Sequence, residues 1–239
     1  AQDIYLTGNP QITFFKVVYR RHTNFSMESI EQTINGTVAT NGRVTITISR
    51  NGDLISRCYL QSTCAASHVL NSAVTDLDNV EIEIGGQKID KHTGHWMEVL
   101  AELTENKTGR AVGTNFQTMS GYGAAVANNT VNAATDAAVG SQCAFILVDQ
   151  ASTIQWTPLQ FWFCRNPGLA LPLIALQYHE VKLIFTFGTV THSDHKVWVD
   201  YIYLDTDERR RFAQVSHEYL IEQVQDQAVG ASTSNQSES

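Results

Sequence analysis

Apolar and polar side chains alternate one by one in several stretches of this sequence, a pattern that an extended strand sorts onto two opposite faces. The stretch GRVTITISR places Val44, Ile46 and Ile48 on one face and threonine or serine on the other. The stretches HEVKLIFTF and VWVDYIYL repeat the pattern. Each is therefore predicted to be a strand with one buried face.

A tight hairpin is predicted in VEIEIGGQKI, where two short strands flank Gly85 and Gly86. Paired glycines accept the positive φ angles that a two-residue hairpin turn requires. Further strand candidates are residues 26–35, 54–63, 143–149 and 160–164. The total of about eight strands, with their spacing, predicts an all-β sandwich or jelly roll.

One segment, TGHWMEVLAELTEN, has a helical period. Trp96, Val99, Leu100 and Leu103 follow the i, i+3, i+4, i+7 spacing, and Thr93 is available as an N-cap. A single helix in a strand-rich chain is an insertion. Enzyme folds in which helices alternate with a parallel sheet are therefore disfavoured.

The composition limits the classes of partner and compartment. The chain has 239 residues, enough for one large all-β domain, and its formal charge of −8 argues against direct nucleic-acid binding. The four cysteines, Cys58, Cys64, Cys143 and Cys164, include no C-x-x-C pair. We interpret them as buried free thiols in a reducing compartment.

Two stretches have the composition of loops or linkers. Residues 111–142 contain Asp136 as their only charged residue and are predicted to form a long outward or intersubunit loop. From Ser216 onward there are four acidic residues and no Lys or Arg, and the last stretch, GASTSNQSES, is typical of a flexible linker.

The common catalytic signatures G-x-S-x-G, G-x-x-x-x-G-K-[ST] and H-E-x-x-H are absent from the sequence. Two H-x-x-H pairs occur, His92 with His95 and His192 with His195. Both lie in polar, turn-like segments, and zinc needs three or four ligands. They are interpreted as ordinary surface histidines, and no metal or cofactor is predicted.

The stretch DTDERRRF sets acidic residues directly before three arginines. The charges either pair across a subunit contact, where opposite charges set orientation, or form a self-neutralising exposed cluster. The sequence favours neither. The cluster Trp156, Phe161, Trp162 and Phe163 could stack on a sugar or a base, but core packing is the preferred interpretation.

Four long segments resemble, in the same order, the major capsid proteins of nucleocytoplasmic large DNA viruses. They are AQDIYLTGNPQITFFKVVYRRHTNFSMESIEQT, VEIEIGGQKIDKHTGHWMEVLAEL, FWFCRNPGLALPLIALQYHEVKLIF and YIYLDTDERRRFAQVSHEYLIEQVQ. The resemblance implies an eight-stranded antiparallel jelly roll with one inserted helix and long loops, the first half of a double jelly roll. It also implies a structural protein of the virion rather than an enzyme.

In this family, homotrimers form pseudo-hexameric capsomers that tile an icosahedral shell. The partners that the resemblance implies are other copies, neighbouring capsomers and minor capsid proteins, with an inner viral membrane nearby but not entered. Assembly is expected in the cytoplasm of the infected host cell. No direct nucleic-acid contact is expected.

The expected organisation is an N-terminal anchor at 1–25, the jelly roll at 26–225 and a polar linker at 226–239 toward a second jelly roll that is not in this chain. The sequence departs from the family pattern in stopping before that second barrel. It also lacks the short leader that normally precedes YLTGNP.

Within residues 9–21, Asn9 and Pro10 suit the start of a helical turn. The apolar run that follows is too short to span a bilayer, so it is interpreted as an anchor under the barrel or against a neighbouring subunit. The predicted subunit-contact residues are Phe14, Phe15, Tyr19, Arg20 and Arg21 in this segment and Asp207, Glu208, Arg209, Arg210 and Arg211 in the charged run.

Two other functions stay open at this level. A carbohydrate-binding jelly roll of the lectin type would use the aromatic cluster and the polar loop. A cupin-like metalloenzyme would need histidines and a carboxylate that converge inside the barrel.

Overall fold

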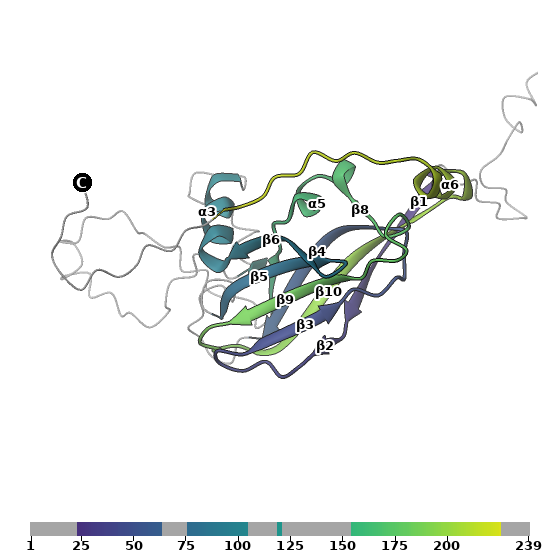
Figure 1. Ribbon diagram of the computed structural model, residues 1–239. Helices are drawn as coiled ribbons and strands as arrows, with labels where there is room; N and C mark the ends of the chain where they lie inside the picture. Colours follow the sequence, from purple (N-terminus) through teal and green to yellow (C-terminus); the bar gives the residue numbers. More distant parts are fainter. Residues whose placement is uncertain (1–22, 64–75, 105–118, 121–153, 226–239) are drawn as a thin grey trace, which may run out of the picture.

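The computed structural model describes residues 23–63, 76–104, 119–120 and 154–225, which form two antiparallel sheets that face each other (Figure 1). In the first sheet, the order is β1 (Phe25–Gln32), β10 (Ser193–Leu204), β4 (Leu54–Thr63), β7 (Ile154–Pro158), with β8 (Leu171–Pro172) also paired to β4. In the second sheet, the order is β2 (Ile34–Asn35), β3 (Arg43–Thr47), β9 (Val181–Phe187), β5 (Leu77–Ile84), β6 (Gln87–Thr93).

The strand order is that of a jelly roll. Neighbouring strands come from distant parts of the sequence, β1 beside β10 and β3 beside β9, and every pairing is antiparallel. The eight longer strands divide four to a sheet, and β2 and β8 add two residues each. The predicted fold class is confirmed.

The core lies between the two sheets and is built from the alternating positions. Val44, Ile46 and Ile48 are buried on one side, and Phe185 of β9 and Tyr201 of β10 are fully buried. Since each strand sends every second side chain inward, the pattern in the sequence directly gives the inner face.

The predicted hairpin between β5 and β6 is confirmed. Ile84 pairs with Gln87, and the two residues between them, Gly85 and Gly86, have φ angles of 59° and 82°. Both positive angles are those of a type I′ turn, which matches the twist of the flanking strands.

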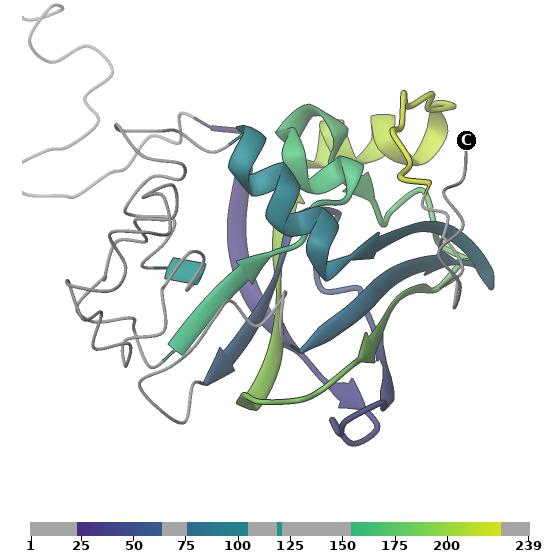
Figure 2. The same ribbon diagram turned by 90° about the vertical axis from the view of Figure 1, so that its left-hand side faces the viewer.

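The helical segments cover the edges of the sandwich rather than its faces (Figures 1 and 2). They are α3 (Gly94–Thr104), α5 (Trp162–Arg165), the 3-10 turn η2 (Pro167–Leu169) and α6 (Thr206–Gln214). Within the described residues, no helix is long and apolar enough to cross a membrane.

Helix α3 confirms the predicted helix and its cap, because the Trp96 amide donates to Thr93 Oγ1 at 3.2 Å. Its buried face differs from the expected stripe. Leu100 is buried and Trp96 half-buried, whereas Val99 and Leu103 are exposed. The helical period predicts the helix correctly, but the buried face of the helix lies about a quarter turn away from the predicted apolar stripe.

Three strand boundaries need correction or remain untested. The predicted strand 160–164 is wrong, because α5 begins within it and the strand of this region is β7. The predicted strand 26–35 is broken at Thr33, where the chain passes from the first sheet to the second. The predicted strand 143–149 lies outside the described residues.

The turns and connections gather at two ends of the sandwich. At one, which we call the Asp76 end, the Asn41 amide donates to the Gly188 carbonyl, and the Gly188 amide donates to the Asp76 carbonyl, each at 2.8 Å. At the other, the α6 end, the Gly85 amide donates to the Glu180 carbonyl at 2.9 Å.

Residues 215–225, which we call the strap, run from α6 back across the fold toward α3 (Figure 1). Glu222 of the strap pairs with Arg165 of α5 at 2.7 Å, and the Gln223 side-chain amide donates to the Ile89 carbonyl of β6 at 2.6 Å. The strap therefore lies along the outer edge of the second sheet.

Candidate functional sites at the two ends of the jelly roll

A buried carboxylate organises the Asp76 end. Asp76 Oδ1 accepts hydrogen bonds from the Thr191 amide at 2.9 Å and the Thr191 hydroxyl at 2.8 Å. Asp76 Oδ2 accepts from His192 Nδ1 at 2.9 Å and His195 Nε2 at 3.1 Å. One side chain at the start of β5 thus holds the connection between β9 and β10.

These contacts fix the protonation state of the carboxyl. Burial by itself raises the pKa of Asp76, but hydrogen bonds from His192, His195 and Thr191 outweigh it. The pKa therefore lies well below its usual value of 3.8, and the side chain is an anion.

The interpretation of the four paired histidines as surface residues is wrong for three of them. His92, His192 and the His195 side chain are buried, and only His95 is exposed. The polar segment around His192 turns inward because Asp76 supplies its partner. No signal in the sequence pointed to Asp76, since a long stretch of chain separates it from the histidines.

Two of the histidines share one carboxylate oxygen, because His192 and His195 each direct a ring nitrogen at Asp76 Oδ2. Elsewhere, His92 Nε2 lies 3.2 Å from Asp90 Oδ2. Across the described residues, no three His, Cys, Asp or Glu side chains are arranged to hold a metal ion.

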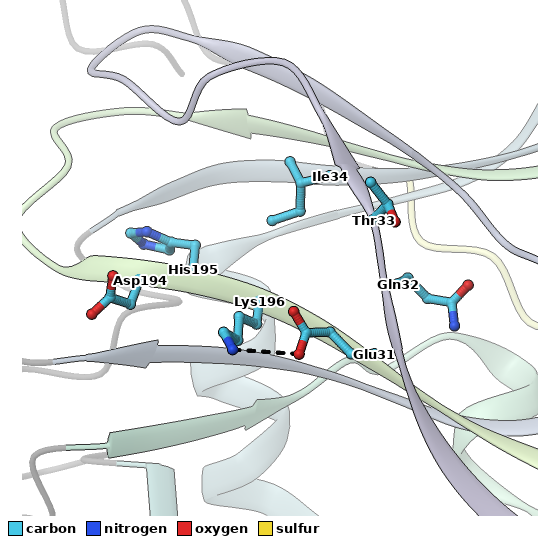
Figure 3. Close-up of a pocket in the computed structure, with 7 residues that line it drawn as sticks. All are labelled: Glu31, Gln32, Thr33, Ile34, Asp194, His195 and Lys196. Atoms are coloured by element: carbon cyan, nitrogen blue, oxygen red, sulfur yellow. Dashed lines mark hydrogen bonds and ion pairs between the residues drawn. The ribbon is translucent and has the colours of Figure 1, made fainter.

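A cavity of about 470 Å³ opens beside this cluster (Figure 3). Its two walls are the break between β1 and β2 and the start of β10, as the sticks of Figure 3 show. Its lining residues are Glu31, Gln32, Thr33, Ile34, Asp194, His195 and Lys196. Lys196 pairs with Glu31 at 3.4 Å along this wall.

At the α6 end, the predicted charged run forms helix α6. No helix was predicted there, because the segment TDERRRFAQ has too few apolar residues to show a period. The order of the charges is the one feature of this segment that indicates a helix. Asp207 and Glu208 lie in the first turn and Arg211 in the last, which complements the helix dipole.

Part of the charged run is used within the chain. Arg209 Nη2 lies 3.0 Å from Asp53 Oδ2, which also accepts the Leu204 amide at 2.8 Å. Arg211 pairs with Glu208 at 3.5 Å along the helix. Nothing in the sequence singles out Asp53 as the partner of Arg209.

Asp207 and Arg210 are exposed, and neither forms an ion pair with another described residue. The prediction that residues 207–211 contact another subunit stays a prediction. The other predicted contact residues, Phe14, Phe15, Tyr19, Arg20 and Arg21, lie outside the described residues, as does the predicted loop at 111–142.

The aromatic cluster belongs mainly to the core. Phe161, Trp162 and Phe163 are buried, so core packing is confirmed for them. Trp156 is half-buried and lies against Trp198, with ring centroids 5.9 Å apart.

Two of the four cysteines are described, and both are free thiols. Cys58 is buried and Cys164 half-buried. A hydrogen bond with Cys164, together with burial, raises the pKa of the Cys58 thiol well above its usual value. Cys64 and Cys143 lie outside the described residues.

Comparison with known proteins identifies the family. Residues 13–205 match the family described as "Major capsid protein N-terminus". The major capsid protein of Pyramimonas orientalis virus is 54% identical over 240 residues, which cover 94% of this chain and 56% of that protein. The major capsid protein of Phaeocystis pouchetii virus is 46% identical, with 98% of this chain and 53% of that protein covered.

A solved structure agrees with these matches. The crystal structure of PBCV-1 VP54, fitted into a cryo-EM reconstruction of the virophage Sputnik, is 41% identical with a TM-score of 0.65. The match covers 89% of this chain and 50% of that one, so this chain spans about half the length of its relatives. The chain belongs to the family of major capsid proteins of large DNA viruses and corresponds to their N-terminal part.

Proposed function

We propose that this chain is the first jelly roll of a capsid protein that forms homotrimers, and that these pseudo-hexameric capsomers tile an icosahedral virion shell. The observation that carries the proposal is the family match over residues 13–205, which coincides with the jelly roll of two antiparallel sheets. Relatives of this kind are structural capsid proteins.

The organisation proposed for the chain follows the same boundaries. Residues 26–225 are the jelly roll, 1–25 the anchor, and 226–239 the linker toward a second jelly roll. Phe14, Phe15 and Tyr19 supply apolar contacts of the anchor, with Arg20 and Arg21 at its edge. The charges of α6 face a neighbouring subunit, a role supported by the exposure of Asp207 and Arg210.

The surroundings proposed for the protein are those of a shell component. Its partners are other copies and minor capsid proteins, an inner viral membrane lies nearby, and assembly takes place in the host cytoplasm. The negative charge of −8 supports the absence of direct contact with nucleic acid, whose phosphates require basic surfaces.

Sedimentation and cryo-electron microscopy of the full-length protein test the proposal. The expected particle has threefold symmetry with a pseudo-hexagonal outline. Reversal of the exposed acid of α6, Asp207→Arg, is expected to weaken trimers, and Asp78→Arg on the exposed side of β5 serves as the control. A full-length protein that stays a monomer at all concentrations would contradict the proposal.

The lectin alternative loses the aromatic part of its ligand surface, because three of the four aromatic residues of the cluster are buried, whereas its polar loop at 111–142 lies outside the described residues. Stacking on a sugar needs an exposed ring face. The cupin alternative needs nitrogen and oxygen ligands that converge, whereas His192 and His195 are bonded to Asp76 itself.

A further inference from the structure

The α6 end carries an apolar groove of about 380 Å³ between the connection after β8 and the segment that follows α6. Its lining includes Ile84, Leu171, Leu176, Phe212, Val215 and Tyr219. These residues come from three separate stretches of the chain, so the groove is a product of the fold.

Large apolar side chains are exposed around this groove. Tyr178 is 93% exposed, Leu220 86% and Val215 56%. Tyr178 lies two residues after Leu176, which lines the groove, yet its ring does not occupy it. An aromatic side chain held in water beside an unfilled apolar groove is an arrangement typical of an interaction surface.

Unpaired charges border the same surface. Arg210 lies on α6 one turn before Ala213, which lines the groove, and Glu218 lies between two lining residues, His217 and Tyr219. Both Arg210 and Glu218 are exposed, and neither forms an ion pair with another described residue. Arg210 and Glu218 therefore provide a cation and an anion at this surface that are available to a partner.

We propose that the occupant of this groove is Tyr178 of a second copy, in a twofold contact in which each copy inserts its tyrosine into the groove of the other. The surface contains both halves of each interaction, a projecting ring with an apolar groove and a cation with an anion. A patch that is complementary to itself forms an isologous contact across a twofold axis.

This inference rests on the proposed function, which requires repeated contacts between copies. It goes further in assigning the contact to neighbouring trimers. A closed threefold ring is held by heterologous contacts, in which the two surfaces lie on different sides of the subunit. Tyr178 and the groove instead lie on the same side of the subunit, which suits a twofold contact between capsomers.

The test uses the full-length protein and measures trimers and larger assemblies by sedimentation over a concentration series. Tyr178→Ala removes the projecting ring, and Ala175→Trp fills the groove from an exposed position. Each is expected to leave trimers intact and to raise the concentration needed for association of trimers at least about tenfold, as for an interface hot spot. Leu103→Ala, an exposed apolar residue on α3, is the matched control.

Charge reversal adds a second test, whose expected result, rescue by a double variant, could not come from a loss of stability. Arg210→Glu and Glu218→Arg are each expected to weaken association of trimers, and the double reversal is expected to restore it. Such rescue requires that the two positions meet across the contact.

The outcomes separate the two proposals. If Tyr178→Ala assembles like the unaltered protein, or lowers the melting temperature while assembly is unchanged, the groove is filled by another part of the same polypeptide and this inference is wrong. If the unaltered protein forms pairs that depend on Tyr178 but no threefold particle, the twofold contact stands and the proposed trimer fails.

Discussion

Asp76 illustrates how much a single buried anion can organise. Its two oxygens accept hydrogen bonds from Thr191, His192 and His195, so the start of β5 and the connection before β10 share one electrostatic centre. Removal of one partner from such a network leaves the other groups buried without an acceptor, which costs more than the net gain of forming it.

Asp76→Asn is expected to lower the free energy of unfolding by about 3 kcal/mol at neutral pH, because an amide cannot accept all these hydrogen bonds as an anion does. Urea unfolding measures the change. Asp78→Asn, an exposed carboxyl two residues further along β5, is the control and is expected to cost less than about 0.5 kcal/mol.

The effect of Asp76→Asn depends on pH with a definite sign. Since the pKa of Asp76 is lower in the folded than in the unfolded protein, its contribution to stability is fully present above its usual pKa of 3.8. The contribution is lost as pH falls from about 4 toward the folded pKa. The difference between the two proteins is therefore expected to shrink below pH 4, and a difference that grew would contradict this account.

Arg209 and Arg210 are adjacent in α6, but among the described residues only Arg209 forms an ion pair. Arg209→Ala is expected to cost about 1 kcal/mol, because Asp53 loses the cation that faces its carboxylate. Arg210→Ala, which breaks no ion pair among the described residues, is expected to change stability by less than about 0.5 kcal/mol. Thermal unfolding of the two variants under the same conditions compares them, and equal losses would refute the distinction.

Among the elements, the turn between β5 and β6 shows two glycines under different constraints. A Cβ on Gly85 would lie 2.6 Å from His179 Nδ1, whereas a Cβ on Gly86 would meet nothing within 4 Å. Both have positive φ, so both substitutions strain the backbone, but only the first also collides with a neighbour.

Gly86→Ala is therefore expected to cost about 1 kcal/mol, and Gly85→Ala clearly more. Chemical denaturation of the two single variants gives the comparison. The order of the two losses is the decisive result, and Gly86→Ala as the more damaging change would show that His179 moves aside freely.

The sequence predicts elements best where one side chain in two is apolar and a sheet covers one face, as in β3 and β9. It fails where three aromatic residues stand in succession, because Phe161, Trp162 and Phe163 all enter the core only if the chain coils through α5. It also fails at α6, whose stability comes from charges and from its contact with Asp53 rather than from an apolar face.

At the scale of the whole molecule, both sheets contribute to one continuous core that contains Cys58. Burial and the raised pKa make this thiol unreactive in the folded protein. Modification of Cys58 by an alkylating reagent is expected to proceed only as fast as global unfolding, whereas half-buried Cys164 reacts sooner. Peptide mass mapping over time distinguishes the two, and early labelling of Cys58 would indicate local opening of β4.

The sequence predicts the fold class of the described residues, because alternating stretches indicate the strands and the family resemblance implies a jelly roll. The order of the strands comes from the structure. The sites were less predictable. Asp76 and Asp53 act on residues far along the chain, and such pairings have no local pattern from which to infer them.

The strap has a mechanical consequence. Tension on the chain beyond residue 225 would first meet Val224, Gln223 and Glu222, whose bonds to β6 and α5 would break one after another. Only after these had separated would the pull reach α6 and then β10. Under tension, the contacts of the strap would therefore break before any force acts on the two sheets.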